Sequence, residues 1–231
     1  MNQLINVGGV ETFSTVDYPS KISAVIFMQG CPWKCPFCYN FLLQPIEETD
    51  FVWDKFVDFL KTRTKSLDGV VFSGGEPLVQ NGLKEAMMQV KALGYKIGLH
   101  TGGYRPEALK KVLDVVDWVG FDIKTPFEKE KYNSVTCANH FDKVLESLKM
   151  LIASDVDFEC RTTCDPRVLN VDDIYKIADT LKEMGVKNYH LQKYRPIDSD
   201  KTTQEYECEE FFKDAKLKEH LQNNFNCQFR M

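Results

Sequence analysis

The sequence predicts an α/β fold, an incomplete (β/α)6 barrel of parallel strands with the helices outside. Short apolar runs rich in β-branched residues alternate along the chain with longer segments whose apolar residues recur at helical spacing. The predicted helices, of about 10 to 15 residues, are long enough to form right-handed crossovers between parallel strands. About six such strand–helix units follow one another, so we expect the active groups on the loops at the carboxyl ends of the strands.

The first predicted strand is Ile22–Met28, an apolar run that ends at Gln29-Gly30 and leads into a loop. Gly69–Phe72 is the second predicted strand. The remaining strands are expected near residues 96–100, 118–123, 156–163 and 188–193. Helices are expected over residues 52–64 and near residues 80–93, 105–114, 141–153 and 171–184, with another around 208–223 in the charged tail.

The composition suits one compact domain, because 43% of the 231 residues are hydrophobic and 27% are charged. No linker, low-complexity tract or repeat divides the chain. We therefore expect a single domain over residues 1–231, with its core at about 15–200 and a C-terminal extension at about 201–231.

Charge and hydropathy exclude two classes of partner. The net charge is −5, and Lys and Arg are scattered among Asp and Glu, which argues against nucleic acid. Residues 1–13 lack the charged and apolar parts of a signal peptide, and no apolar run reaches the roughly 20 residues that span a bilayer. We expect a cytoplasmic protein with no membrane partner.

Three of the eight cysteines lie in one short loop, Cys31-Pro-Trp-Lys-Cys35-Pro-Phe-Cys38. In a reducing compartment such a group indicates metal binding or catalysis rather than disulfides. A closed zinc site needs four ligands, whereas three thiolates on a four-iron cluster leave one iron open to a chelating small molecule. Spacing alone also permits a zinc site completed by a distant residue, a thiol redox pair of Cys35 and Cys38, or plain buried cysteines.

This C-x3-C-x2-C spacing, with Phe37 directly before the third cysteine, resembles the signature of radical S-adenosylmethionine (SAM) enzymes. The resemblance implies a [4Fe–4S] cluster held by Cys31, Cys35 and Cys38, with the methionine part of SAM on the open iron and Phe37 beside the adenine. It also implies the chemistry. An electron from the reduced cluster would break the sulfonium S–C5′ bond and give methionine and a 5′-deoxyadenosyl radical.

Gly74-Gly75-Glu76 follows the second predicted strand. Two glycines let the backbone approach a ligand closely, and Glu76 adds an acceptor for an ammonium, although a glycine turn capped by Glu76 would look the same. The resemblance implies that this segment holds the methionine amino group. It implies a ribose site at Thr101, after the third strand. Related activases often have Asp where His100 stands, and a lone histidine is more often a structural residue.

Two further strand ends carry charged residues. Alternation along the fourth strand places Asp122 and Lys124 on one side, where they could simply pair. The resemblance places such a pair at the methionine moiety, and Arg161, at the end of the fifth strand, is our candidate for the SAM carboxylate. Cys160 and Cys164 flank Arg161 on the opposite face. We expect them to pack in the core rather than bind a second cluster, because only the scattered Cys137, Cys208 and Cys227 remain.

A finer resemblance precedes the cysteine loop. Gly8-Gly9-Val10 and the run from Thr15 to Lys21 resemble the activating protein of anaerobic ribonucleoside-triphosphate reductase. That family abstracts hydrogen from a glycine Cα of its partner reductase, so the resemblance implies a protein substrate and an anaerobic setting. We expect reduced flavodoxin or ferredoxin as electron donor, since the chain shows no flavin or second-cluster motif of its own.

Two alternatives to this function remain open in the sequence. One is a radical SAM enzyme for a small molecule, similar to carboxydeazaguanine synthase. The other is a zinc module or thiol oxidoreductase without a cluster. The segment His190–Pro196, after the sixth strand, could receive a glycine loop or could merely close the fold.

Overall fold

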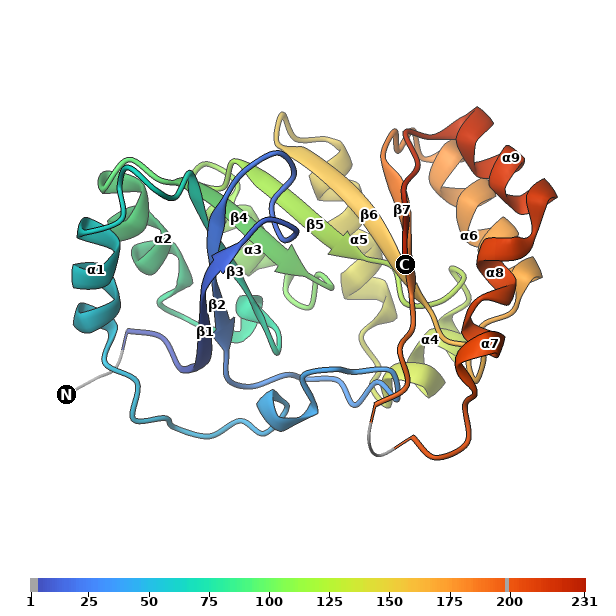
Figure 1. Cartoon of the computed structure of the whole chain (residues 1–231), viewed down its shortest axis with the longest axis horizontal. Helices are drawn as coiled ribbons and strands as arrows, with labels where there is room; N and C mark the ends of the chain where they lie inside the picture. The colour runs from blue at the N-terminus through green and yellow to red at the C-terminus, as the bar shows by residue number, and fades with distance from the viewer. Residues whose placement is uncertain (1–3, 198–199) are drawn as a thin grey trace. The chain divides into compact units, whose positions relative to one another are not determined.

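The computed structural model describes residues 4–197 and 200–231. Residues 1–3, at the start of the N-terminal segment tested for a signal peptide, and residues 198–199, at the end of the predicted core, lie outside the described residues. Within the described chain the strands form one sheet whose order follows the sequence from β1 to β8 (Figure 1). The order ends at β1 and β8 without closing. The predicted α/β fold, an unclosed sheet of largely parallel strands with helices around it, is confirmed.

All six predicted strands are present, as β2 Ser23–Met28, β3 Gly69–Gly74, β4 Lys96–Thr101, β5 Trp118–Asp122, β6 Asp157–Cys164 and β7 Tyr189–Lys193. The pairs β2–β3, β3–β4 and β6–β7 are parallel. Two edge strands were not predicted: β1 Val7–Ser14, which is antiparallel to β2, and β8 Phe229–Arg230, which is parallel to β7. β1 has adjacent glycines and polar residues, and β8 has two residues, so neither shows an apolar strand pattern.

The predicted helices of the core are α1 Trp53–Lys61, α2 Leu83–Ala92, α3 Pro106–Val112, α5 Phe141–Ile152 and α6 Val171–Glu183. Two short 3-10 turns, η1 Phe41–Leu43 and η2 Pro77–Val79, lie in loops, and the mostly polar α4 Lys129–Thr136 was not predicted. The prediction of one helix over 208–223 is wrong. The tail forms α7 Glu205–Cys208, α8 Glu210–Lys213 and α9 Ala215–Asn224, because Asp214 is extended and caps α9 by accepting from the Leu217 N–H.

The structure forms two compact units, and the single-domain assignment stays a prediction. Unit 1 comprises the chain up to Pro32, Asn40–Gly120 and Lys143–Asp157; unit 2 comprises Trp33–Tyr39, Phe121–Asp142 and Phe158–Met231. In the described part of the chain, no helix is long and apolar enough to cross a membrane.

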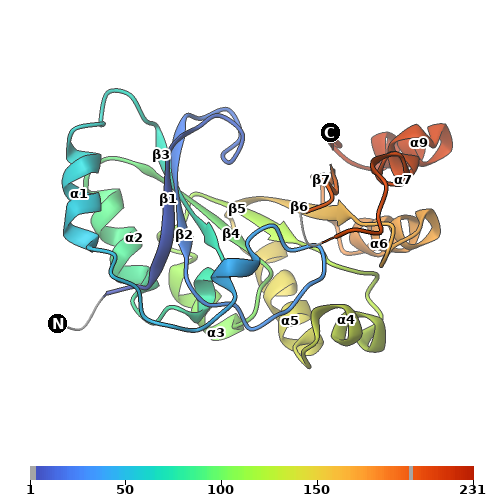
Figure 2. The same cartoon turned by 60° about the horizontal axis from the view of Figure 1, so that its bottom comes forward.

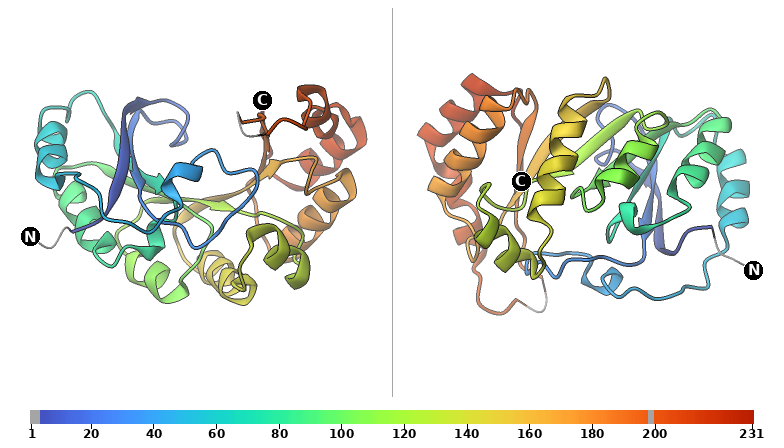
Figure 3. Two further views of the ribbon diagram at one scale, coloured as in Figure 1. Left: turned by 90° about the horizontal axis from the view of Figure 1, so that it is seen from below. Right: turned by 180° about the vertical axis from the view of Figure 1, so that it is seen from behind.

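In unit 1, helices α1, α2 and α3 line one face of strands β2, β3 and β4 (Figure 3). Apart from the half-buried Phe27, the apolar residues of these strands are buried, which explains why the strands have near-continuous hydrophobic sequences. The run from Thr15 to Lys21 contributes to this packing, because the Tyr18 ring stacks on Trp118 with 5.3 Å between ring centroids.

In unit 2, α9 lies beside α6 (Figure 2), and His220 Nε2 is 3.0 Å from an Asp179 carboxylate oxygen between them. Near the start of β6, Arg230 donates two hydrogen bonds to the buried carboxylate of Glu159, at 2.6 and 3.0 Å. His190 Nε2 lies 3.1 Å from the same carboxylate, and its Nδ1 accepts from the Gln228 N–H. His190 therefore has a structural role, as the fold-closing interpretation of the His190–Pro196 segment requires.

Candidate functional site

The Gly-Gly-Glu segment lies directly against the residue that precedes Cys31. The Gly75 N–H donates to the Met28 carbonyl and the Glu76 N–H donates to the Gly30 carbonyl, each at 2.9 Å. A Cβ on Gly75 would lie 2.3 Å from the Gly30 carbonyl oxygen, and Gly74 has a φ of +106°. Both glycines are therefore needed to bring this segment alongside the start of the cysteine loop.

Glu76 is buried, with 1% of its surface exposed, and its carboxylate holds the turn after β4. One oxygen accepts from the Leu78 N–H at 3.0 Å and from the Thr101 hydroxyl at 2.6 Å. The other accepts from the Gly102 N–H at 2.9 Å. The structure thus brings the predicted residues Glu76 and Thr101 together, and the carboxylate that could meet an ammonium also organises the backbone beside it.

His100, next to Thr101, is a structural residue of unit 1. Its Nδ1 lies 3.2 Å from the Ser73 hydroxyl, and its Nε2 lies 2.9 Å from the Asp17 carbonyl oxygen. The ring meets Trp118 edge-on at 5.6 Å. Both ring nitrogens have partners in the protein, which matches the structural interpretation of this histidine.

Within the described residues, the three loop cysteines form no disulfide, and each is half-buried. Cys31 belongs to unit 1, where its N–H donates to the Gln44 carbonyl at 3.0 Å, and Cys35 and Cys38 belong to unit 2. The Cys38 N–H donates to the Cys35 carbonyl at 3.2 Å, which closes a turn. Among the described residues no three His, Cys, Asp or Glu side chains are gathered as metal ligands. Cluster ligation by the three cysteines therefore stays a prediction.

Burial and one nearby cation act on the Cys35 thiol in opposite directions. Burial raises the pKa of the Cys35 thiol to about 11, and the positive charge of Lys124 opposes that shift. Iron coordination would remove the proton, and the neighbouring lysine would favour the thiolate. Phe37, the predicted adenine neighbour, is buried against Tyr194 and Cys208.

The side chains of Asp122, Lys124 and Arg161 lie together in unit 2, and their roles towards SAM stay predictions. Arg161 donates to one oxygen of the Asp122 carboxylate at 3.1 Å, and the Lys124 ammonium lies 3.6 Å from the other. The Arg161 and Lys124 side chains are only 8% and 11% exposed, whereas that of Asp122 is 39% exposed. Lys124 also lies over the Trp33 ring, 5.1 Å from its centroid. Two shielded cations thus flank one accessible carboxylate.

The cysteines outside the loop are dispersed. Cys160 and Cys164 are fully buried, as expected for core residues, and burial raises the pKa of both thiols. Cys208 is also buried, whereas Cys137 is exposed.

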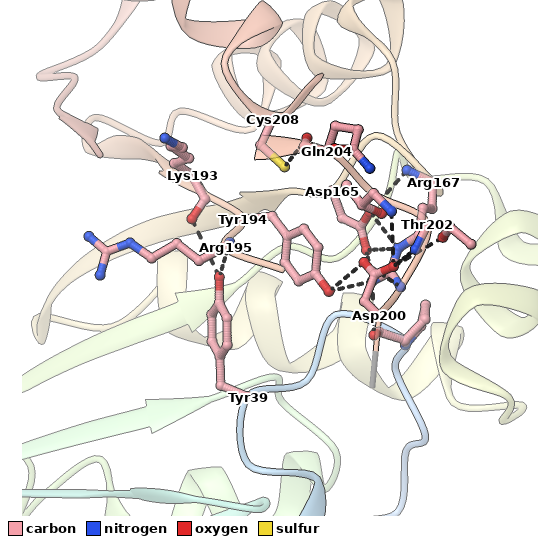
Figure 4. Close-up of polar contacts among 12 residues, drawn as sticks. Tyr39, Asp165, Arg167, Lys193, Tyr194, Arg195, Asp200, Thr202, Gln204 and Cys208 are labelled. Carbon is pink, nitrogen blue, oxygen red and sulfur yellow. Dashed lines mark hydrogen bonds and ion pairs between the residues drawn. The ribbon is translucent and has the colours of Figure 1, made fainter. Parts of the chain in front are cut away.

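A group of hydrogen-bonded polar residues in unit 2, which the sequence did not reveal, is shown in Figure 4. Arg167 lies at its centre and contacts Asp165, Tyr194 and Asp200. The available signal was position, because Asp165-Pro-Arg167 directly follows β6 just as Gly75-Glu76 directly follows β3.

Comparison with known proteins identifies the family to which this chain belongs. Residues 25–164 match the model of the radical SAM superfamily. A Methanocaldococcus jannaschii protein, named provisionally as a glycyl-radical enzyme activating enzyme, is 33% identical over 84% of this chain and 81% of its own length. The pyruvate formate-lyase-activating enzyme of Clostridium pasteurianum is 25% identical over 93% of this chain and 96% of its own.

A solved structure supports the fold independently. Streptococcus suis SuiB bound to S-adenosylmethionine superposes with a TM-score of 0.64 at 14% identity, covering 87% of this chain and 48% of SuiB, about half of its length. A likeness at that identity shows the fold alone. The family match over most of the chain decides the assignment: this protein belongs to the radical SAM superfamily and is an oxidoreductase of the kind that uses a [4Fe–4S] cluster and S-adenosylmethionine.

Proposed function

We propose that this protein generates a glycyl radical on a partner enzyme, and that the partner is an anaerobic ribonucleoside-triphosphate reductase. The observation that carries the proposal is the near full-length likeness to two proteins named as activating enzymes. The run from Thr15 to Lys21 and Gly8-Gly9-Val10 favour the reductase. The zinc-module and thiol-oxidoreductase alternatives do not account for the family match over residues 25–164.

The site residues have matching proposed roles. Cys31, Cys35 and Cys38 would hold the cluster, which supplies the electron for cleavage of SAM when bound. Gly74, Gly75 and Glu76 would receive the methionine amino group, because their backbone is fixed beside Gly30. Asp122 and Lys124 would contact the methionine moiety, Arg161 its carboxylate, Thr101 the ribose and Phe37 the adenine.

The proposed reaction is a hydrogen-atom transfer. One electron from flavodoxin or ferredoxin breaks the S–C5′ bond of SAM and gives methionine and a 5′-deoxyadenosyl radical. The radical takes one hydrogen atom from a glycine Cα of the partner, so the products are 5′-deoxyadenosine and a glycyl radical. We place the reaction in the cytoplasm, with no nucleic-acid or membrane partner.

The experiment has two stages. The protein is reconstituted anaerobically with iron and sulfide, reduced with dithionite and given SAM, and 5′-deoxyadenosine is measured by chromatography. Anaerobic ribonucleotide reductase and pyruvate formate-lyase are then added separately, and a glycyl radical is sought by electron paramagnetic resonance (EPR). A radical on the reductase alone supports the proposal. A radical on the lyase alone overturns the choice of partner, and 5′-deoxyadenosine without a radical on either protein overturns the activase assignment for both.

A further inference from the structure

Arg167 joins four segments of unit 2 through one side chain. Its Nε and Nη2 donate to the Asp165 carboxylate at 3.0 and 2.6 Å, and its Nη1 lies 2.9 Å from Asp200. Nη2 also donates to the Tyr194 hydroxyl at 2.8 Å and to the Pro36 carbonyl at 3.0 Å. Figure 4 shows the Arg167 side chain beside Asp165, Tyr194 and Asp200.

The surroundings fix the direction of the guanidinium. The side chains of Asp165 and Asp200 are 0% and 1% exposed, and both buried carboxylates form an ion pair with this cation. Tyr194 is also fully buried, donates to Asp200 at 3.0 Å and lies under the guanidinium, with 4.8 Å from the ring centroid to Arg167 Cζ. In one orientation the planar guanidinium faces all of these partners with its five N–H donors, and the two N–H groups of Nη2 are shared among three acceptors.

That orientation directs one N–H of Arg167 at the cysteine loop. Pro36 lies between Cys35 and Cys38, and its carbonyl is the loop atom that Arg167 contacts. After Pro36 in the sequence, Phe37 packs on Tyr194, and the Tyr39 hydroxyl accepts from the Arg195 N–H at 2.7 Å. The Tyr39 ring also stacks on Tyr194 at 6.0 Å. The loop is thus held from the ends of β6 and β7 by contacts that do not use its thiols.

We propose that Arg167 is a positioning residue for the cluster, which fixes the peptide between Cys35 and Cys38 through the Pro36 carbonyl. The inference rests on the proposed ligation by these cysteines. A charged donor at a carbonyl between two ligands restricts the directions in which both thiolates point. Groups that orient metal ligands from outside the coordination shell typically change metal affinity or activity by about 10- to 100-fold when removed.

The test uses the anaerobically reconstituted full chain and compares wild type with Arg167→Lys and Arg167→Ala. Lysine keeps the charge for Asp165 and Asp200 but lacks the planar fork needed to reach Pro36 at the same time. Arg63→Ala is the matched control, since Arg63 also stacks on an aromatic ring, that of Phe59, in unit 1. The measurements are the rate of iron loss to a chelator, the EPR spectrum of the reduced cluster with and without SAM, and the melting temperature.

For Arg167→Lys we expect a melting temperature close to wild type, iron loss roughly 10-fold faster, and an EPR spectrum broadened before and after SAM addition. The control should match wild type in all three. Wild-type iron loss and EPR in Arg167→Lys would overturn the proposal, as would iron loss that only follows a lower melting temperature. If Arg167→Ala does not fold, the comparison of Arg167→Lys with wild type is sufficient to test the positioning role of Arg167. Wild-type iron retention in Cys35→Ala would instead refute the ligand assignment itself.

Discussion

The Thr101 hydroxyl donates a 2.6 Å hydrogen bond to the buried carboxylate of Glu76. Glu76 therefore determines the shape of the turn after β4, in addition to any contact with SAM. This relationship connects the Gly-Gly-Glu segment with the proposed ribose site, although 25 residues separate them in sequence. The backbone conformation of this turn in unit 1 therefore depends on the Glu76 carboxylate.

Glu76→Gln should destabilise the protein and reduce SAM cleavage. The amide can accept at one oxygen only, so a donor would face the amide nitrogen, and an unmet buried hydrogen bond costs about 1–3 kcal/mol. Urea denaturation should show a loss of unfolding free energy in this range, together with reduced 5′-deoxyadenosine formation. Glu85→Gln, at an exposed position of α2, is the control. Equal stability of the two variants would contradict the role of Glu76.

Cys35→Ala should remove a cluster ligand and abolish SAM cleavage, whereas Cys160→Ala should leave the iron content nearly intact. Cys160 is fully buried in β6, where its loss leaves only a small cavity. Iron and sulfide analysis after anaerobic reconstitution measures the cluster content of both variants, and 5′-deoxyadenosine formation measures SAM cleavage. Equal iron loss from the two variants would refute the ligand assignment, and iron well above four per chain in wild type would indicate a second cluster.

Asp122→Asn should weaken SAM binding by roughly 10-fold if the carboxylate contacts SAM through a charge-assisted hydrogen bond, because such bonds contribute about 1.5–3 kcal/mol. Equilibrium binding of SAM to the reconstituted enzyme provides the measurement. Asp142→Asn is a suitable control, since Asp142 pairs with exposed Lys129. Lower stability with unchanged SAM affinity would show that Asp122 serves only to pair Arg161 and Lys124.

Acid should destabilise the protein through Glu159. Burial opposes ionisation, but hydrogen bonds from His190 and Arg230 lower the pKa of Glu159 to about 2 from the ordinary 4.5. A folded-state pKa below the unfolded one contributes stability that is present above about pH 4.5 and is lost as the pH falls towards 2. The full contribution is about 3 kcal/mol.

Urea denaturation between pH 6 and about pH 4 measures the beginning of that loss. Glu159→Gln should be less stable than wild type at pH 6 and should lose less stability on acidification. Parallel pH profiles for the two proteins would show that Glu159 contributes no pH-dependent stability.

Sequence patterns identified the six central strands because their burial is nearly continuous: Val70, Val71 and Phe72 of β3, for example, have no exposed surface. The edge strand β1 lacks such a pattern, since only Val7 and Ser14 are buried within it. Residues 7–14 form a strand because they pair with β2. That pairing depends on the three-dimensional arrangement of the chain, which the local sequence of β1 does not show. Likewise, the break at Asp214 depends on a cap that a helical periodicity does not reveal.

Alternation along the chain predicted that Asp122 and Lys124 lie on one side, and the Lys124 ammonium is 3.6 Å from the Asp122 carboxylate, although β5 itself ends at Asp122. The position of Arg167 after β6 could have marked it as a candidate, but its role could not be predicted, because that role depends on contacts with Pro36, 131 residues away, and with Asp200. Tyr18 belongs to the run that resembles activating proteins of anaerobic ribonucleotide reductase, and its ring packs on Trp118. This part of the resemblance therefore indicates a shared fold as much as a shared partner enzyme.

Strand β1 has one further consequence. It covers the edge of β2, whose sequence SAVIFM has no charge and no proline and would be a template for intermolecular β-sheet. β1 itself carries Glu11, and its register with β2 shifts between Val7 and Gly9 and between Glu11 and Ser14. An irregular, charged outer strand is a poor surface for another chain to extend. The N-terminal residues thus protect the apolar centre of the sheet from aggregation.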